Sequence, residues 1–345
     1  MTNADVVAVA KAGRTAEPEP VLSASGLVKS FPLRRNLLGR VTERLHAVDG
    51  VDLAVAPGRT LGVVGESGSG KSTVGRIVAR LVRPDAGRVV VAGRDLTDVR
   101  GEELRRARAD LQMIFQNPWS ALDPTKTIGH AVAEPLLVHG RIGRADMAAA
   151  AAELLERVAL DPGLVDRYPS MLSGGQRQRV CIARALAVGP RVLIADEPTS
   201  ALDLSTRSEI LNLLLRLQDD GGQAVVLISH DVTTIKHLAH RVAVMYLGRI
   251  VEDGPVDEVM GDPRHPYTRV LLSAVPQPDP EAAARRERIV VVGEPPSPVD
   301  LPSGCRFRTR CPIAVAECAA VDPALTAVTG QHRVACLREG SGSLG

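Results

Sequence analysis

The chain carries the stretch Gly65-Glu66-Ser67-Gly68-Ser69-Gly70-Lys71-Ser72-Thr73, which fits the phosphate-loop pattern G-x-x-x-x-G-K-[ST]. Its glycines let backbone N–H groups converge on phosphate oxygens, while the lysine neutralises charge and the hydroxyl of Ser72 reaches Mg²⁺. Residues 61–64 are a short apolar run typical of a buried strand, and residues 74–81 have helical spacing. A plain glycine turn would need neither these flanks nor the Lys-Ser-Thr ending. The stretch therefore predicts an α/β fold with a nucleotide site at a helix N-terminus.

A second apolar run, residues 191–195, ends in two carboxylates, Asp196 and Glu197. A buried strand rarely ends in two acids without a reason. Beside a phosphate loop, Asp196 suits the outer shell of the Mg²⁺ bound at Ser72, and Glu197 suits a base that polarises the water attacking the γ-phosphate. An acidic turn at a strand end is the alternative. The pair predicts ATP and Mg²⁺ as ligands.

Four further motifs follow in order: Met113-Ile114-Phe115-Gln116-Asn117-Pro118, Met171-Leu172-Ser173-Gly174-Gly175-Gln176, Ser200-Ala201-Leu202-Asp203 and Ile228-Ser229-His230-Asp231. Together with the first two, they resemble the ATP-binding cassette of ABC transporters over about Val21 to Pro276. The resemblance implies a RecA-like core, an antiparallel β subdomain and a helical subdomain at about 117–190. It places a flexible tail at 1–20 and an ABC ATPase domain at 21–264.

The resemblance also implies catalytic and Mg²⁺-binding roles for individual residues. Glu197 is the expected general base, His230 holds the γ-phosphate and the attacking water, and Lys71 and Gln116 complete the catalytic set. Ser72, Gln116 and Asp196 are the expected Mg²⁺ residues. A lone glutamine before a turn, or a histidine at a strand end, is otherwise more often structural.

Phe31 resembles the aromatic residue that stacks on adenine. It lies unusually far before the phosphate loop, so an ordinary core aromatic is one alternative, and His46 is a weaker candidate for the stacking role. Asp203 resembles the D-loop aspartate, and it also suits an N-cap for a helix beginning near Ser205.

The segment Ser173-Gly174-Gly175 opens a predicted helix, Gln176 to Ala187. The N-terminal amides and the hydroxyl of such a helix accept a phosphate group, yet the phosphate loop of the same chain already surrounds one nucleotide. One chain therefore has two half-sites. The resemblance implies that two cassettes stack head to tail with ATP between them, and that closure, hydrolysis and reopening drive a membrane partner.

Composition limits the other classes of function. The 345 residues include 45% hydrophobic residues, enough for one large domain with an appendage, and 42 basic against 40 acidic residues give a net charge of +2. This balance predicts no nucleic-acid partner of the strongly basic type. No apolar run reaches the 18 or so residues of a membrane span; the longest candidates are short strands such as Ala224 to Ser229.

The N-terminal residues 1–20 have neither the basic start nor the cleavage pattern of a signal peptide. We therefore expect the chain at the cytoplasmic face of the inner membrane, attached peripherally through permease subunits. The basic residues Arg34, Arg35 and Arg40 suit either lipid head groups or, more simply, a solvated loop.

An alanine-rich helical insert occupies about Ile128 to Tyr168, with strong helix propensity over 147–158. By resemblance, this insert carries the signature motif. The stretch Gln116 to Asp123 forms its joint with the core, where cytoplasmic helices of two membrane subunits dock. A plain pair of surface helices is the alternative.

The C-terminal residues narrow the subfamily. The segments 265–276, beginning His265-Pro266-Tyr267-Thr268, and 304–312 resemble the ATP-binding subunits of oligopeptide/dipeptide importers. The resemblance implies a C-terminal domain at 265–345, a heterodimer with a second ATPase subunit, two permease subunits and an extracytoplasmic substrate-binding protein. Import of another solute such as nickel, or an exporter cassette, is the alternative.

Four of the five cysteines, Cys305, Cys311, Cys318 and Cys336, fall in this region, while Cys181 suits a core position. In a cytosolic chain such a group indicates a metal site rather than disulfides. The spacing lacks the C-x₂-C pairs of zinc ribbons, and cysteines with one followed by proline suit a 4Fe-4S cluster, as members of the family can carry. Zinc, or thiols without a ligand, are the alternatives. We expect a structural or redox role, because nothing in the sequence places these cysteines near nucleotide.

Other classes with similar motifs fit less well. DNA-repair ATPases of the SMC type separate the phosphate loop and signature by a long coiled coil, and translation factors with paired cassettes carry two phosphate loops. This chain has one phosphate loop, followed by its signature about a hundred residues later. A cassette that only binds ATP would have lost Glu197 or His230, and both are present.

Overall fold

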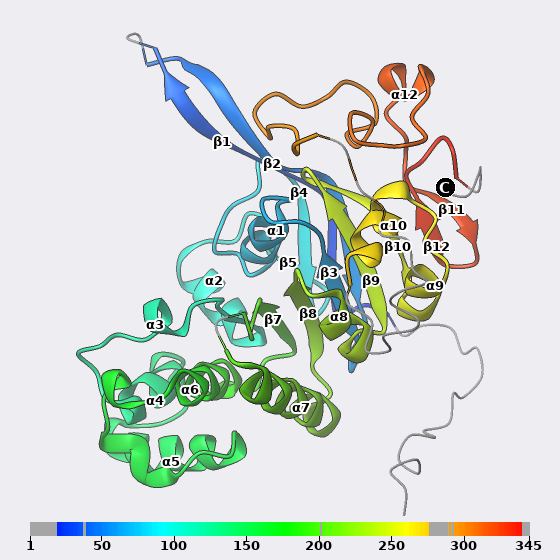
Figure 1. Ribbon diagram of the computed structural model, residues 1–345. Helices are drawn as coiled ribbons and strands as arrows, with labels where there is room; N and C mark the ends of the chain where they lie inside the picture. The colour runs from blue at the N-terminus through cyan, green and yellow to red at the C-terminus, as the bar shows by residue number, and fades with distance from the viewer. Residues whose placement is uncertain are drawn as a thin grey trace, which may run out of the picture.

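Two sheets form the framework of the computed structural model, which describes residues 19–36, 39–200, 202–275, 289, 291 and 293–339 (Figure 1). The predicted tail lies almost wholly outside these residues, as do Ala201 and Pro276 of the predicted motifs. The smaller sheet is antiparallel with the strand order β2-β1-β4-β5, and the larger has the order β11-β12-β10-β9-β3-β8-β7-β6. The strands are β1 (Leu22–Arg35), β2 (Val41–Val55), β3 (Thr60–Val64), β4 (Ala86–Val91), β5 (Arg94–Asp95), β6 (Leu111–Ile114), β7 (Val192–Asp196), β8 (Ala224–Ser229), β9 (Arg241–Tyr246), β10 (Arg249–Pro255), β11 (Thr326–Thr329) and β12 (His332–Val334).

The centre of the larger sheet is parallel. Strands β9, β3, β8, β7 and β6 run in the same direction, and every residue of β3, β7 and β8 is buried. Continuous apolar runs are typical of parallel strands covered on both faces. The apolar runs predicted as strands at 61–64, 191–195 and 224–229 are confirmed, and their carboxyl ends meet at one edge, where ligands bind in such sheets.

Helices cover this sheet and form a separate layer beside it (Figure 1). They are α1 (Lys71–Val78), α2 (Gly101–Ala107), α3 (Pro118–Ala121), α4 (Ile128–Val138), α5 (Met147–Arg157), α6 (Gly174–Leu186), α7 (Leu204–Gly221), α8 (Val232–Leu238), α9 (Val256–Gly261), α10 (Pro266–Ser273) and α12 (Glu317–Ala320). The layer consists of α3 to α6, where α4, α5 and α6 pack against one another through fully buried side chains such as Val132, Leu155 and Val180. The helices predicted at 147–158 and 176–187 are confirmed as α5 and α6, with ends that agree to within three residues.

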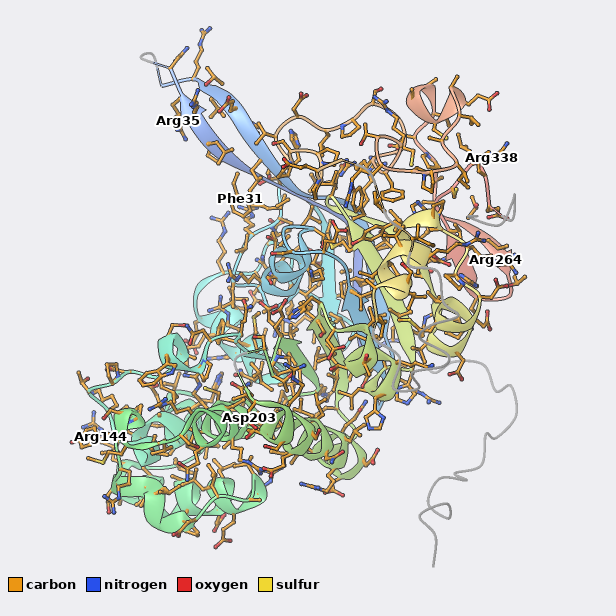
Figure 2. All side chains as sticks on the ribbon, viewed as in Figure 1. Phe31, Arg35, Arg144, Asp203, Arg264 and Arg338 are labelled. Carbon is orange, nitrogen blue, oxygen red and sulfur yellow. The ribbon has the colours of Figure 1, made fainter. Side chains whose placement is uncertain are left out.

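Strands β1 and β2 form a long hairpin that projects beyond the rest of the molecule (Figure 1). Arg34, Arg35 and Arg40 are exposed at its outer end, and Figure 2 shows Arg35 there, with Phe31 nearer the body of the sheet. Phe31 pairs with Leu45 across the hairpin. The hairpin explains why the chain between Phe31 and the phosphate loop is unusually long.

The C-terminal residues join the larger sheet rather than lying apart from it. Strand β12 pairs with β10 through Glu252 with Val334 and Asp253 with Arg333, and β11 extends the sheet by one more strand. Beneath this contact the His332 imidazole lies 2.7 Å from the Glu252 carboxylate, and both side chains are almost completely buried. Neither strand was expected from the sequence.

Candidate nucleotide site

The phosphate loop connects β3 to α1, as the sequence predicts. Lys71 is the first residue of α1, and its ammonium donates hydrogen bonds to the backbone carbonyls of Gly65 at 2.7 Å and Glu66 at 2.8 Å. Burial lowers the pKa of Lys71, while the nearby carboxylates of Glu197 and Asp196 act in the opposite direction. The loop therefore folds around its own lysine and presents a positive charge at the start of a helix.

Two glycines of the loop allow close packing against neighbouring strands. A Cβ atom at Gly65 would lie 2.1 Å from the carbonyl oxygen of Met245, and one at Gly70 would lie 2.1 Å from the carbonyl oxygen of Ala47. Both glycines have positive φ angles, 155° and 103°. No other residue type fits at either position without moving a strand.

Two of the three expected Mg²⁺ residues, Ser72 and Asp196, come together at the end of β7, while Gln116 contacts Glu197 instead. The Ser72 hydroxyl donates a 2.9 Å hydrogen bond to the Asp196 carboxylate. Burial raises the pKa of Asp196, and the bond from Ser72 opposes this rise. A cation at this point would offset the cost of burying the carboxylate, so the donor set fits Mg²⁺ bound between Ser72 and Asp196 alongside ATP.

Glu197 lies between two of the predicted catalytic residues. The Gln116 side-chain amide donates to one carboxylate oxygen at 2.9 Å, and the His230 Nδ1 lies 3.1 Å from the other. These residues come from the ends of three neighbouring strands, β6, β7 and β8. Glu197 itself has a φ of 46°, an uncommon conformation for a residue with a side chain and one found at functional sites. The structure thus brings the three side chains together, and their catalytic roles stay predictions.

The signature motif forms the start of α6, in the helical layer. The Ser173 hydroxyl accepts from the Gln176 N–H at 3.3 Å, and the Gln176 side chain accepts from the Ser173 N–H at 2.9 Å, which makes a capping box. A Cβ at Gly175 would meet Thr206 of α7 at 2.5 Å, so the motif packs closely against that helix. The remaining N-terminal amides of α6 form a suitable anion site.

Asp203 caps α7, as predicted. Its carboxylate accepts from the Thr206 N–H at 2.9 Å and from the hydroxyls of Ser205 and Thr206, and the hydrogen bond from Ser205, followed by those from Thr206, lowers its pKa. Figure 2 shows Asp203 at the start of α7. The capping role is confirmed, while the D-loop role stays a prediction.

The two candidates for adenine stacking occupy different places. Phe31 packs at the margin of the core, with the Lys29 ammonium 5.5 Å from its ring centroid. His46 is exposed and directly precedes Ala47, the residue that contacts Gly70 of the phosphate loop. Both lie on the hairpin strands, and the assignment to Phe31 stays a prediction.

Comparison with known proteins gives consistent matches. A family model described as "ABC transporter" matches residues 48–200, and one described as "Oligopeptide/dipeptide transporter, C-terminal region" matches residues 251–318. The oligopeptide transport ATP-binding protein OppF of Salmonella typhimurium is 48% identical over 295 residues, which cover 85% of this chain and 88% of that protein. This chain belongs to the ATP-binding subunits of the oligopeptide/dipeptide ABC transporter family. It is an ABC ATPase, a cassette that hydrolyses ATP to drive transport.

A second related protein and a solved structure are also similar to this ABC ATPase. The probable peptide ABC transporter ATP-binding protein y4tS of Sinorhizobium fredii is 46% identical over 318 residues, 92% of this chain and 90% of that protein. The ATP-binding cassette MJ0796, solved as a dimer in a post-hydrolysis state bound to ADP and Pi, has a TM-score of 0.61 and 30% identity over 68% of this chain and 98% of that one. The fold of the subunit is therefore the P-loop ABC ATPase fold.

The four C-terminal cysteines of the subunit line one cavity, together with His265 and Phe307. Its free volume is about 10 Å³. Burial raises the pKa of Cys305 and Cys336, and raises that of Cys311 to about 11. Over the described ranges, no three His, Cys, Asp or Glu side chains are arranged to hold a metal ion. This arrangement supports neither zinc nor the expected 4Fe-4S cluster, although the four thiols do line one cavity.

The segment that carries these cysteines also contacts the phosphate loop. Arg310, the residue before Cys311, lies with its guanidinium 3.1 Å from the carboxylate of Glu66 in the phosphate loop. Tyr267 also contacts Glu66. The segment around Tyr267 stood out in the sequence as a subfamily marker, but no local pattern assigns either residue to the nucleotide site.

Proposed function

We propose that this ABC ATPase powers the import of di- or oligopeptides through a membrane transporter. ATP hydrolysis is supported by the position of Glu197 between Gln116 and His230, beside the phosphate loop. The peptide assignment is supported by the C-terminal match over 251–318 and by the relatives named for peptide and oligopeptide transport. Another relative, of which this chain covers 45%, is the glutathione import ATP-binding protein GsiA of Escherichia coli, 52% identical over 283 residues.

The active form in this proposal is a dimer of cassettes, with the second chain a different ATPase subunit. ATP is held between the phosphate loop of one cassette and the signature helix α6 of the other. The dimeric MJ0796 structure supports the pairing of two cassettes, and the helix N-terminus at Ser173 suits a phosphate group.

Permease subunits would dock at the joint between the core and the helical layer. A pocket of about 390 Å³ opens there, lined by residues of β6, α3 and α6 and by residues that follow α1 and β6, among them Leu81, Phe115 and Arg184. Beside it, Trp119 is 61% exposed. The Arg177 guanidinium lies 3.4 Å from the centroid of the Trp119 ring. An exposed tryptophan beside a pocket is typical of a protein interface. This position supports the predicted role of residues 116–123 in receiving two permease subunits.

The chain therefore acts in this proposal as a peripheral subunit at the cytoplasmic face of the inner membrane, working with an extracytoplasmic binding protein. Within the described part of the chain, every helix is too short or too polar to cross a lipid bilayer.

The test is ATP hydrolysis by the complete transporter in liposomes, with its binding protein present. We expect di- or oligopeptides to stimulate hydrolysis and to accumulate in the compartment that receives imported solute, because the family couples closure on ATP to solute movement. Nickel ions are the matched alternative cargo. Stimulation by nickel but not by peptides, or peptide movement in the opposite direction, would exclude the proposal and leave the ATPase assignment intact.

We also propose that the four cysteines of the C-terminal region hold a 4Fe-4S cluster. Four thiols around one cavity match the number of ligands that such a cluster requires. Backbone N–H groups lie close to the sulfurs, such as Arg338 N–H to the Cys336 sulfur at 3.4 Å, and such contacts stabilise thiolates. When bound, the cluster would supply structural linkage and redox sensitivity.

Analysis of protein purified without oxygen tests the cluster. We expect about four iron and four acid-labile sulfide ions per chain, as a four-cysteine 4Fe-4S cluster contains, with visible absorption that disappears in Cys311→Ser. Cys181→Ser is the matched control, because Cys181 is buried in the core away from the cavity, and should keep its iron. Zinc, or no metal, in the unmodified protein would contradict the cluster.

A further inference from the structure

Aromatic residues are concentrated behind the phosphate loop. The sequence has only three tyrosines and three phenylalanines, yet Tyr246, Tyr267 and Phe307 pack together with ring centroids 4.6 to 5.5 Å apart. Each is at most 2% exposed. Tyr246 ends β9 of the core, whereas the other two come from the C-terminal region. This aromatic cluster fastens the C-terminal region to the strand beside the nucleotide site.

Two polar groups of the C-terminal region extend from this cluster to one residue of the phosphate loop. The Glu66 backbone N–H donates a 2.7 Å hydrogen bond to the Tyr267 hydroxyl. The Arg310 guanidinium, on a side chain only 11% exposed, lies 3.1 Å from the Glu66 carboxylate. The backbone and the side chain of Glu66 are thus held at once, both from outside the loop.

The position of Glu66 affects the shape of the phosphate loop, because its backbone contacts Lys71. The Glu66 carbonyl and that of Gly65 accept the hydrogen bonds of the Lys71 ammonium. Gly65 is wedged against Met245, immediately before Tyr246 of the aromatic cluster. A shift of Glu66 would therefore move the acceptors of Lys71 and the N–H groups that follow, and displacements of about 1 Å at such sites carry large functional costs.

We propose that Tyr267 and Arg310 are positioning residues for nucleotide. They act through Glu66, holding the first half of the phosphate loop in the shape that binds the phosphates of ATP. Both lie beyond the 48–200 match to the general ABC model and within the 251–318 match. The C-terminal region is therefore part of the ATP-binding apparatus in this chain, whichever solute the transporter moves.

Tyr267→Phe is the first test, because it removes the hydroxyl and keeps the packed ring. We expect the dissociation constant for mant-ATP, measured by fluorescence on the full chain, to rise about fivefold, the ratio that loss of one ordinary hydrogen bond gives. The melting temperature without nucleotide should change little. Tyr168→Phe is the matched control, since Tyr168 is exposed in the helical layer, and its affinity should equal that of the unmodified chain.

Arg310→Ala tests the second contact, with Arg310→Lys to restore the charge. We expect weaker mant-ATP binding in the alanine variant and partial recovery with lysine. Arg308→Ala is the matched control, because Arg308 bonds within its own segment, to Ser303. In a Glu66→Gln background, Arg310→Ala should add little, since its effect passes through the Glu66 carboxylate.

Three results would overturn the proposal. One is unchanged mant-ATP affinity in both Tyr267→Phe and Arg310→Ala, even with a lower melting temperature, because a purely structural role predicts that pattern. Another is a full additional effect of Arg310→Ala in the Glu66→Gln background. The third is equal loss of affinity in the two control variants.

Discussion

Glu197→Gln is expected to lower ATP turnover by the assembled transporter about 10²- to 10⁴-fold, the usual loss when a positioned base is removed. The carboxylate oxygens of Glu197 face the Gln116 amide at 2.9 Å and the His230 imidazole at 3.1 Å. Glutamine has the same shape, so the site keeps its form, but an amide cannot accept the proton of the attacking water. ATP binding should persist, because Lys71 and the rest of the phosphate loop are untouched.

Phosphate release at saturating ATP measures this loss, and nucleotide affinity is measured in parallel. Glu153→Gln is a matched control, because Glu153 lies on the exposed side of α5 in the helical layer. Turnover within threefold of the unmodified transporter would show that another group activates the water.

The isolated chain should bind ATP but turn it over at least about 10²-fold more slowly than the assembled transporter, the scale of losing one set of transition-state donors. In the proposed dimer, these donors are the N-terminal amides and the Ser173 hydroxyl of a second cassette. A single chain supplies its own phosphate loop, Glu197 and His230, but no signature helix across from them.

The measurement is turnover per chain over a dilution series, with the monomer established by light scattering. The rate per chain should rise when the second ATPase subunit is added, because pairing completes the shared site. A Glu197→Gln preparation reports any contaminating ATPase. Rapid turnover by a dilute, demonstrably monomeric sample would contradict the shared site.

The phosphate loop, Asp196 and Glu197 were predictable from local patterns, because they lie at the ends of short apolar strands and the ends of parallel strands meet at one edge of a sheet. Gln116 and His230 were assigned only through the resemblance to the ABC cassette, since a glutamine before a turn or a histidine at a strand end is otherwise more often structural. The structure brings both side chains to Glu197.

The contacts of Tyr267 and Arg310 were not predictable in this way. Each bonds to Glu66 across more than 200 residues of chain, and only the packing of the C-terminal region on β9 brings them there. Strands β11 and β12 escaped prediction for a related reason. They are four and three residues long, too short to show a clear period, and pairing with β10 rather than local propensity makes them strands.

The position of β12 also bears on how this chain behaves if it is shortened. Strand β10 would otherwise be the last strand on its side of the larger sheet, with an open row of backbone N–H and C=O groups that favours pairing with other chains. Removal of the residues after Ser303 would expose that row and also leave the buried carboxylate of Glu252 without its imidazole partner. The C-terminal hairpin therefore protects the cassette against aggregation through its sheet edge.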